Sequence, residues 1–154
     1  MAVVSSIEPL KTPLRYPGGK SRACKKIQPY LPNLYEFDSF YEPFLGGGSL
    51  AIYITKKYRH LRINVGDLYE PLYNFWICLQ GKGEEMAKEL KSLKSSHSTP
   101  DLAKELFTQS KDIINDDTKS ELERAIAFYI VNKCSFSGLT ESSSFSESAS
   151  NYNF

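Results

Sequence analysis

Three consecutive glycines, residues 46–48, are the part of this sequence best suited to bringing a backbone against a ligand. Residues 39–42 before them are largely aromatic and apolar and predict a strand, and Ser49 begins a stretch that predicts a helix. A strand, a glycine turn and a helix bring backbone N–H groups close to a polar or anionic ligand. Glycine suits such a turn because it allows positive φ and close approach.

The spacing around this turn indicates a nucleoside. Gly46, Gly48 and Ala51 match the pattern G-x-G-x-x-A of nucleotide-binding folds. Residues 61–67 predict a second strand that ends in Asp67, where a Rossmann-like fold places a carboxylate that accepts hydrogen bonds from ribose hydroxyls. We therefore predict that the turn and Asp67 bind one nucleoside-containing ligand. A tight turn that needs glycines only for steric reasons is the alternative.

A second glycine-containing loop, residues 14–21, precedes this unit. Its Gly-Lys-Ser sequence resembles the end of a phosphate-binding P-loop, but Leu14 stands where that motif requires glycine, and Pro17 interrupts the loop. If the loop contacts a ligand, we expect a positive charge from Lys20 and an aromatic face from Tyr16. A simple proline–glycine turn explains the same residues.

Composition predicts one globular domain and limits its chemistry. The chain has 154 residues, of which 41% are hydrophobic and 24% charged. It shows no apolar run of membrane length and no signal-peptide pattern, so we expect a soluble, cytoplasmic protein. Cys24, Cys78 and Cys134 are isolated, and we predict neither a metal site nor a disulfide framework. Residues 9–35 contain basic and no acidic side chains, which suits phosphate contacts or a solvated helix equally well.

Apolar spacing predicts the elements that position these residues. A basic helix is expected from Lys20 to about Tyr30, and a helix over residues 70–79 is expected to bury Leu72, Phe75, Trp76 and Leu79. Two glycines at residues 81 and 83 predict a break after this helix. Three further helices are predicted: one over residues 84–94, one that begins at Pro100 with Thr99 as its cap, and one that begins at about Asp117–Thr118. The serine-rich residues after Lys133 predict an ordered hairpin or loop rather than a linker, because phenylalanines interrupt them.

Four blocks, taken together and in this order, resemble the Dam-like adenine-N6 DNA methyltransferases. They are Arg-Tyr-Pro-Gly-Gly-Lys at residues 15–20, Glu-Pro-Phe-Leu-Gly-Gly-Gly-Ser at residues 42–49, Val-Gly-Asp-Leu at residues 65–68 with Leu-Tyr-Asn at 72–74, and residues 127–138. The resemblance spans almost the whole chain. It implies S-adenosylmethionine as cofactor, rather than NAD, and duplex DNA as partner.

The resemblance also implies roles for individual residues. Tyr16 packs on the cofactor, Lys20 neutralises charge in the pocket, and Asp67 takes the ribose hydroxyls. The methionine side of the cofactor is lined by Phe44, Gly46, Gly48 and Ser49. The expected DNA contacts come from the end of the recognition insert and its hairpin, at Asn132, Lys133, Ser135 and Ser137.

The sequence departs from the family at the catalytic motif. Such enzymes hold the flipped adenine with an Asp-Pro-Pro-Tyr type sequence, and no two prolines are adjacent in this chain. No catalytic residue is therefore expected here. We predict a truncated or split enzyme whose remainder is on a second polypeptide or a longer chain, and an open sheet edge that makes the isolated chain unstable or associating.

The resulting expectation is an α/β protein with a partial Rossmann-like S-adenosylmethionine-dependent methyltransferase fold. Residues 1–82 form the first part of the cofactor-binding domain, and residues 83–154 form an all-helical target-recognition insert with the start of its DNA-contacting hairpin. The expected function is adenine-N6 methylation of duplex DNA. A non-catalytic DNA- or cofactor-binding module is the main alternative, and an NAD-dependent enzyme, supported only by the glycine spacing, is a weaker one.

Overall fold

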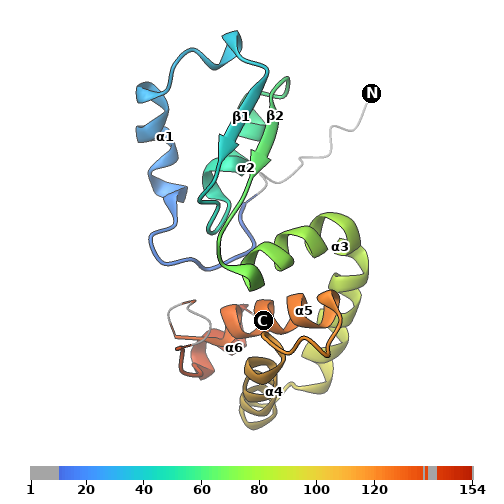
Figure 1. The fold of residues 1–154 in the computed structure, drawn as a ribbon. Helices are drawn as coiled ribbons and strands as arrows, with labels where there is room; N and C mark the ends of the chain where they lie inside the picture. Colours follow the sequence, from blue (N-terminus) through green and yellow to red (C-terminus); the bar gives the residue numbers. More distant parts are fainter. Residues whose placement is uncertain (1–10, 137, 139–141, 154) are drawn as a thin grey trace, which may run out of the picture.

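A computed structural model describes residues 11–136, 138 and 142–153, and its elements form a small α/β part and a larger helical part (Figure 1). Strands β1 (Ser39–Glu42) and β2 (Arg62–Val65) pair in parallel, and helix α2 (Ser49–Lys57) connects them. The register places Phe40 beside Ile63 and Glu42 beside Val65. The predicted unit of strand, glycine turn, helix and strand is therefore confirmed, and the glycine turn lies at the carboxyl end of β1.

Helix α2 covers one face of this two-stranded sheet. Ile54 of α2 and Tyr58, which follows the end of this helix, are buried with Leu61, and Phe40 and Ile63 pack against them from the strands. Side chains alternate between the faces of a strand. Tyr41 therefore points to the opposite face, where 72% of its surface is exposed.

The basic segment before the sheet is less helical than expected. It forms a 3₁₀ turn η1 (Lys20–Arg22), one turn of helix α1 (Cys24–Ile27) and a second 3₁₀ turn η2 (Gln28–Tyr30), followed after a gap by η3 (Leu34–Glu36). The prediction of one continuous helix over residues 20–30 is wrong. Gly19 offers no capping side chain at its start, and Pro29 lacks the amide that a longer helix would need.

Helix α3 (Glu70–Ser96) joins the two parts of the molecule (Figure 1). It includes both predicted helices, residues 70–79 and 84–94. The expected break between them is present as a kink at Lys82, whose φ of −135° and ψ of 28° are not helical. The expected boundary between residues 82 and 83 falls at this kink, inside one helix.

The helical part continues with α4 (Pro100–Ile113), α5 (Glu121–Cys134) and α6 (Glu147–Asn153). Helix α4 begins as predicted, since the Thr99 hydroxyl accepts a hydrogen bond from the Leu102 N–H at 3.4 Å. Helix α5 begins later than the predicted Asp117–Thr118. Its start is fixed by a capping box in which Ser120 and Glu123 each accept a hydrogen bond from the other's backbone N–H.

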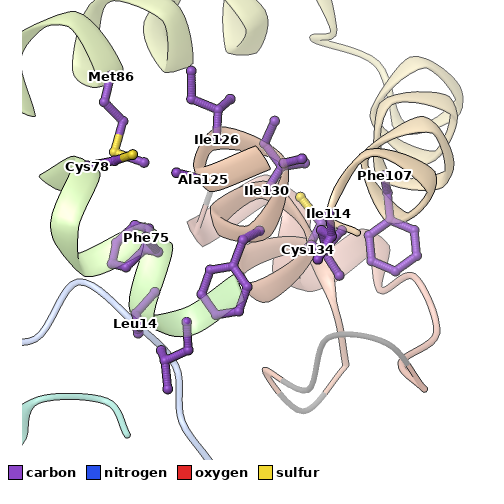
Figure 2. Packing of buried hydrophobic residues seen from close by; sticks show 14 of the residues in the cluster. Leu14, Phe75, Cys78, Met86, Phe107, Ile114, Ala125, Ile126, Ile130 and Cys134 are labelled. Atoms are coloured by element: carbon purple, nitrogen blue, oxygen red, sulfur yellow. The ribbon is translucent and has the colours of Figure 1, made fainter. Parts of the chain in front are cut away.

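The main core lies between α3, α4 and α5. Figure 2 shows its labelled side chains, which come from these three helices and from Ile114 directly after α4, together with Leu14 at the start of the glycine-containing loop over residues 14–21. The buried members include Leu72, Phe75, Met86, Phe107, Ile114, Ile126, Phe128 and Ile130. Because Leu14 is buried in this cluster, the core holds the start of the loop in place.

The serine-rich segment is ordered where the structure describes it. Ser135 and Phe145 form an antiparallel bridge, the Phe136 N–H donates to the Ser144 carbonyl at 3.1 Å, and the Ser146 N–H donates to the Cys134 carbonyl at 2.8 Å. We call the described residues of this segment, 135, 136, 138 and 142–146, the recognition hairpin, after the DNA contact that the sequence analysis expects of it. Helix α6, which follows it, was not predicted, because its serines and asparagines give no apolar periodicity.

Candidate functional site

The glycine turn after β1 has two residues in the left-handed region. Gly46 has φ of 52° and Gly48, which precedes α2, has φ of 70°. The Gly48 N–H donates to the Leu45 carbonyl at 2.9 Å, and the Gly46 N–H donates to Asp67 Oδ2 at 2.8 Å. Neither of these two amides is therefore bare in this structure, because each already has an acceptor within the chain.

Asp67 lies directly beside the turn, as its spacing predicted. Besides Gly46, its carboxylate accepts a hydrogen bond from the Tyr69 N–H at 3.1 Å, through Oδ1. Each carboxylate oxygen can accept more than one hydrogen bond. Asp67 is only partly buried, so both oxygens have further capacity toward a ligand. The carboxylate thus joins the end of β2 to the glycine turn.

Two aromatic rings pack on the glycines and account for their lack of side chains. A Cβ at Gly46 would lie 3.0 Å from Tyr16 Cε1, and one at Gly48 would lie 2.6 Å from Trp76 Cζ2. The indole Nε1–H of Trp76 also donates to the Gly46 carbonyl at 3.2 Å. Steric crowding by these rings is thus one reason for glycine at both positions, as the alternative interpretation of the turn proposed. Trp76 therefore contacts the site as well as the core.

The glycine-containing loop over residues 14–21, which we call the Tyr16 loop, is held against the start of α2. The hydroxyls of Ser21 and Ser49 are 2.8 Å apart, and the Cys24 thiol donates to the Lys20 carbonyl at 3.1 Å. Partial burial, followed by the negative charge of Asp67, raises the pKa of the Tyr16 hydroxyl. The predicted cofactor residues of the loop, the turn and β2 are therefore neighbours in space.

Glu42, at the end of β1, is the polar residue of this region that the sequence analysis did not single out. It is 6% exposed, and its Oε1 lies 3.6 Å from the Lys20 ammonium nitrogen. Its other oxygen, Oε2, is buried without a hydrogen-bond partner in the described part of the chain. Desolvation raises the pKa of this carboxyl group, and the nearby charge of Lys20 and the backbone N–H of Ala51 oppose that shift. An acid at the end of a strand that otherwise carries aromatic and apolar side chains was the available signal.

These groups line one cavity of about 300 Å³. Its walls combine the Tyr16 and Lys20 loop, the glycine turn, Glu42, Asp67 and Phe44, and all seven predicted cofactor residues except Gly48 line it. Phe44 is 78% exposed at its edge. The size falls in the range of small-molecule sites, which begins at about 300 Å³. The cavity offers one cation, two carboxylates and two aromatic rings to a ligand.

The predicted DNA-contacting residues fall into two groups. Asn132 and Ser135 are 1% and 0% exposed, and the Asn132 side chain is hydrogen-bonded to the backbone of Arg15 and Gly138. Neither side chain reaches the surface, so the expectation that they contact DNA does not fit this arrangement. Ser137 lies outside the described residues.

Lys133 and Phe136 remain at the surface of the same region. The Lys133 ammonium lies 5.3 Å from the centre of the Tyr129 ring, and its pKa is lowered, mainly by burial and then by the positive charge of Arg15. Phe136 is 77% exposed at the start of the recognition hairpin. Protein surfaces that bind nucleic acids use cationic side chains to contact phosphates and exposed aromatic rings to stack on unpaired bases.

The described residues contain no metal site, disulfide or membrane-spanning helix. Within residues 11–136, 138 and 142–153 no group of His, Cys, Asp and Glu is arranged to hold a metal ion. The three cysteines are buried thiols. Of the helices described, none has the length and apolar character needed to cross a membrane.

Comparison with known proteins identifies relatives of this arrangement. Residues 16–154 match the family described as D12 class N6 adenine-specific DNA methyltransferase. The chain is 26% identical over 133 residues to the type II methyltransferase M.MjaIII of Methanocaldococcus jannaschii, a match that covers 82% of this chain and 46% of that protein. It is 29% identical over 126 residues to the DNA N-6-adenine-methyltransferase of Escherichia phage P1, covering 82% of this chain and 15% of that protein. The chain therefore spans less than half the length of either relative.

Proposed function

The chain belongs to the D12 class of N6 adenine-specific DNA methyltransferases, and we propose that it binds S-adenosylmethionine and duplex DNA for the methylation of adenine at N6. One observation carries the proposal: the Tyr16 loop, the glycine turn, Glu42 and Asp67 line a single cavity. The small parallel sheet beneath it would then be the first part of a Rossmann-like fold.

The charged groups of the cavity suit the two ends of this cofactor. Lys20 and Glu42 place a cation and an anion 3.6 Å apart, which matches the carboxylate and ammonium of an amino acid. The buried Oε2 of Glu42 lacks a partner in the described chain, and an ammonium group would supply one. Asp67 would accept hydrogen bonds from the ribose hydroxyls. When bound, S-adenosylmethionine supplies an electrophilic methyl group.

The aromatic residues would hold the rest of the cofactor. Tyr16 packs on Gly46 and Gly47 and lines the cavity, so its ring can bury one side of a ligand there. Phe44 at the edge would cover another side and exclude water. DNA would lie across the recognition hairpin, with Lys133 near a phosphate and Phe136 stacked on a base.

A fluorescence titration tests cofactor binding directly. Trp76 is the chain's single tryptophan, and its ring lies against the glycine turn, so ligand binding should change its emission. We expect a saturable change with S-adenosylmethionine and none with NAD. A response to NAD alone would instead favour a dinucleotide enzyme.

The Asp-Pro-Pro-Tyr type sequence that would hold the flipped adenine is absent from these residues, since no two of the prolines are adjacent. We therefore propose that these 154 residues act with a further catalytic segment. The test is transfer of labelled methyl groups to duplex DNA, with and without the protein encoded immediately downstream. Transfer only in the presence of that protein supports a split enzyme. Binding of cofactor and DNA without transfer in either case supports a non-catalytic module.

A further inference from the structure

Arg15 joins the Tyr16 loop to the carboxyl end of α5 and the recognition hairpin. Its guanidinium donates through Nη1 to the Ser135 carbonyl at 2.7 Å and to the Lys133 carbonyl at 3.3 Å, and through Nη2 to the Phe136 carbonyl at 3.1 Å. The last carbonyls of a helix have no partner within the helix, and a cation there is favourable. One side chain thus satisfies three acceptors that lie about 120 positions later in the sequence.

Asn132 completes this connection from the other side. Its Oδ1 accepts a hydrogen bond from the Arg15 N–H at 3.0 Å, and its Nδ2 donates to the Arg15 carbonyl at 2.6 Å and to the Gly138 carbonyl at 2.8 Å. Asn132 therefore bonds both backbone groups of Arg15 as a neighbouring strand would. Its burial means that water does not compete for these bonds.

Gly138 shows how closely the two segments approach. It has φ of +74°, and a Cβ at this position would lie 2.6 Å from the Arg15 carbonyl oxygen. A larger residue would push the hairpin away from the loop. We call Arg15, Asn132 and Gly138 the hairpin clamp.

The clamp lies next to the cavity along the chain. Arg15 is followed by Tyr16, whose ring packs on Gly46 and lines the cavity, and it is preceded by Leu14, which is buried in the core. The clamped backbone therefore has a fixed point on one side and a cavity-lining residue on the other. A ligand that restricts Tyr16 would restrict the adjacent clamp as well.

From these contacts we propose that Arg15 and Asn132 are positioning residues that hold the recognition hairpin on the Tyr16 loop. A ligand that fills the cavity would then also stabilise the hairpin. The part that concerns cavity filling rests on the proposed function, because the ligand used to test it is S-adenosylmethionine. By linkage, DNA on the hairpin would raise the affinity for the cofactor by the same factor as the cofactor raises the affinity for DNA.

Amide hydrogen exchange of the full chain tests the clamp. The reporters are the Phe136 and Ser146 amides, which close the hairpin. Without ligand, Arg15→Lys keeps the charge but cannot reach all three carbonyls, and we expect it to speed exchange of both amides by about tenfold or more. The matched control is Arg59→Lys, at an exposed position outside both the cavity and the clamp.

The cofactor arm uses saturating S-adenosylmethionine. We expect it to slow hairpin exchange in the wild type and in the control, but not in Arg15→Lys. Asn132→Asp is a second variant, in which an acceptor replaces the amide donor and faces the carbonyls of Arg15 and Gly138, and it should behave in the same way. Unchanged hairpin exchange in Arg15→Lys would overturn the clamp. Equal acceleration throughout α3, α4 and α5 would also overturn it, because it would indicate a general loss of stability.

The two proposals fail in different ways. If the wild type does not bind S-adenosylmethionine in the Trp76 titration, the proposed function is refuted, and exchange in the ligand-free variants still decides whether the clamp holds the hairpin. If the cofactor binds but leaves hairpin exchange unchanged in the wild type, the coupling is refuted and the proposed function stands.

Discussion

Replacing Glu42 with glutamine should stabilise the fold at neutral pH and weaken cofactor binding. Burial raises the pKa of Glu42 above its ordinary value despite the opposing charge of Lys20. The folded chain therefore holds this proton more tightly than the unfolded chain. This contribution to stability is complete below the unfolded-state pKa of 4.5 and is lost as the pH rises through the higher folded-state pKa.

The ionised carboxylate thus lowers the stability of the wild type at pH 7, and Glu42→Gln removes that effect. In urea unfolding we expect the variant to be more stable than the wild type at pH 7 to about 8. The difference should shrink as the pH falls toward the unfolded-state value. A variant that is less stable at pH 7 would refute the argument that desolvation outweighs the ion pair with Lys20.

Cofactor binding should change in the opposite direction. A hydrogen bond to a charged group contributes about 1.5–3 kcal/mol, which corresponds to roughly tenfold to 150-fold in affinity. We expect the lower end of that range, because the Lys20 side chain is 44% exposed and already neutralises part of the carboxylate. The assay is the Trp76 titration, with the exposed Glu85→Gln as control. Unchanged affinity for S-adenosylmethionine would exclude Glu42 from the cofactor site.

Four further substitutions test other parts of the structure. Asp67→Asn removes an acceptor from the turn and the ribose site, so cofactor affinity should fall by about 1–3 kcal/mol, and an unchanged titration would exclude this carboxylate. Gly48→Ala places a methyl group on Trp76 at a positive φ and should reduce stability by about 1–3 kcal/mol, measured by thermal unfolding. Lys133→Gln should weaken DNA binding and reduce the slope of log affinity against log salt by about 1, whereas an equal slope would argue against a phosphate contact. Ser120→Ala removes the cap of α5 and should cost about 1 kcal/mol in urea unfolding.

Local chemistry made part of the fold predictable. Pro100 after a capping threonine marked the start of α4, and aromatic and apolar residues on either side of a glycine turn marked β1, α2 and β2. Such signals lie within a few residues of the element they determine. The same local rules misplaced the start of α5, because Asp117–Thr118 belongs to a turn in which Asp116 accepts from the Thr118 N–H at 2.9 Å.

The sequence predicted most of the residues of the site, but fewer of the contacts that they make with one another. The spacing of Gly46 and Asp67 predicted that they are neighbours, which the structure confirms, yet it gave no indication that they bond each other directly. Asn132 was expected to face DNA and is instead buried against Arg15. No periodicity or motif records a contact across more than a hundred residues, because it depends on how α5 packs on the core.

The length of helix α3 determines how α5 and the recognition hairpin are oriented relative to the cavity. Each residue in an α-helix advances the chain by about 1.5 Å and rotates it by about 100°. Inserting one residue between Glu70 and the kink at Lys82 would turn every later side chain of α3 by that angle. Helix α5, packed on α3, would then present Asn132 to solvent or to the wrong side of the Tyr16 loop. The number of residues before the kink is therefore set by the need to bring two distant segments into register, and an indel there should be far less tolerated than one between α4 and α5.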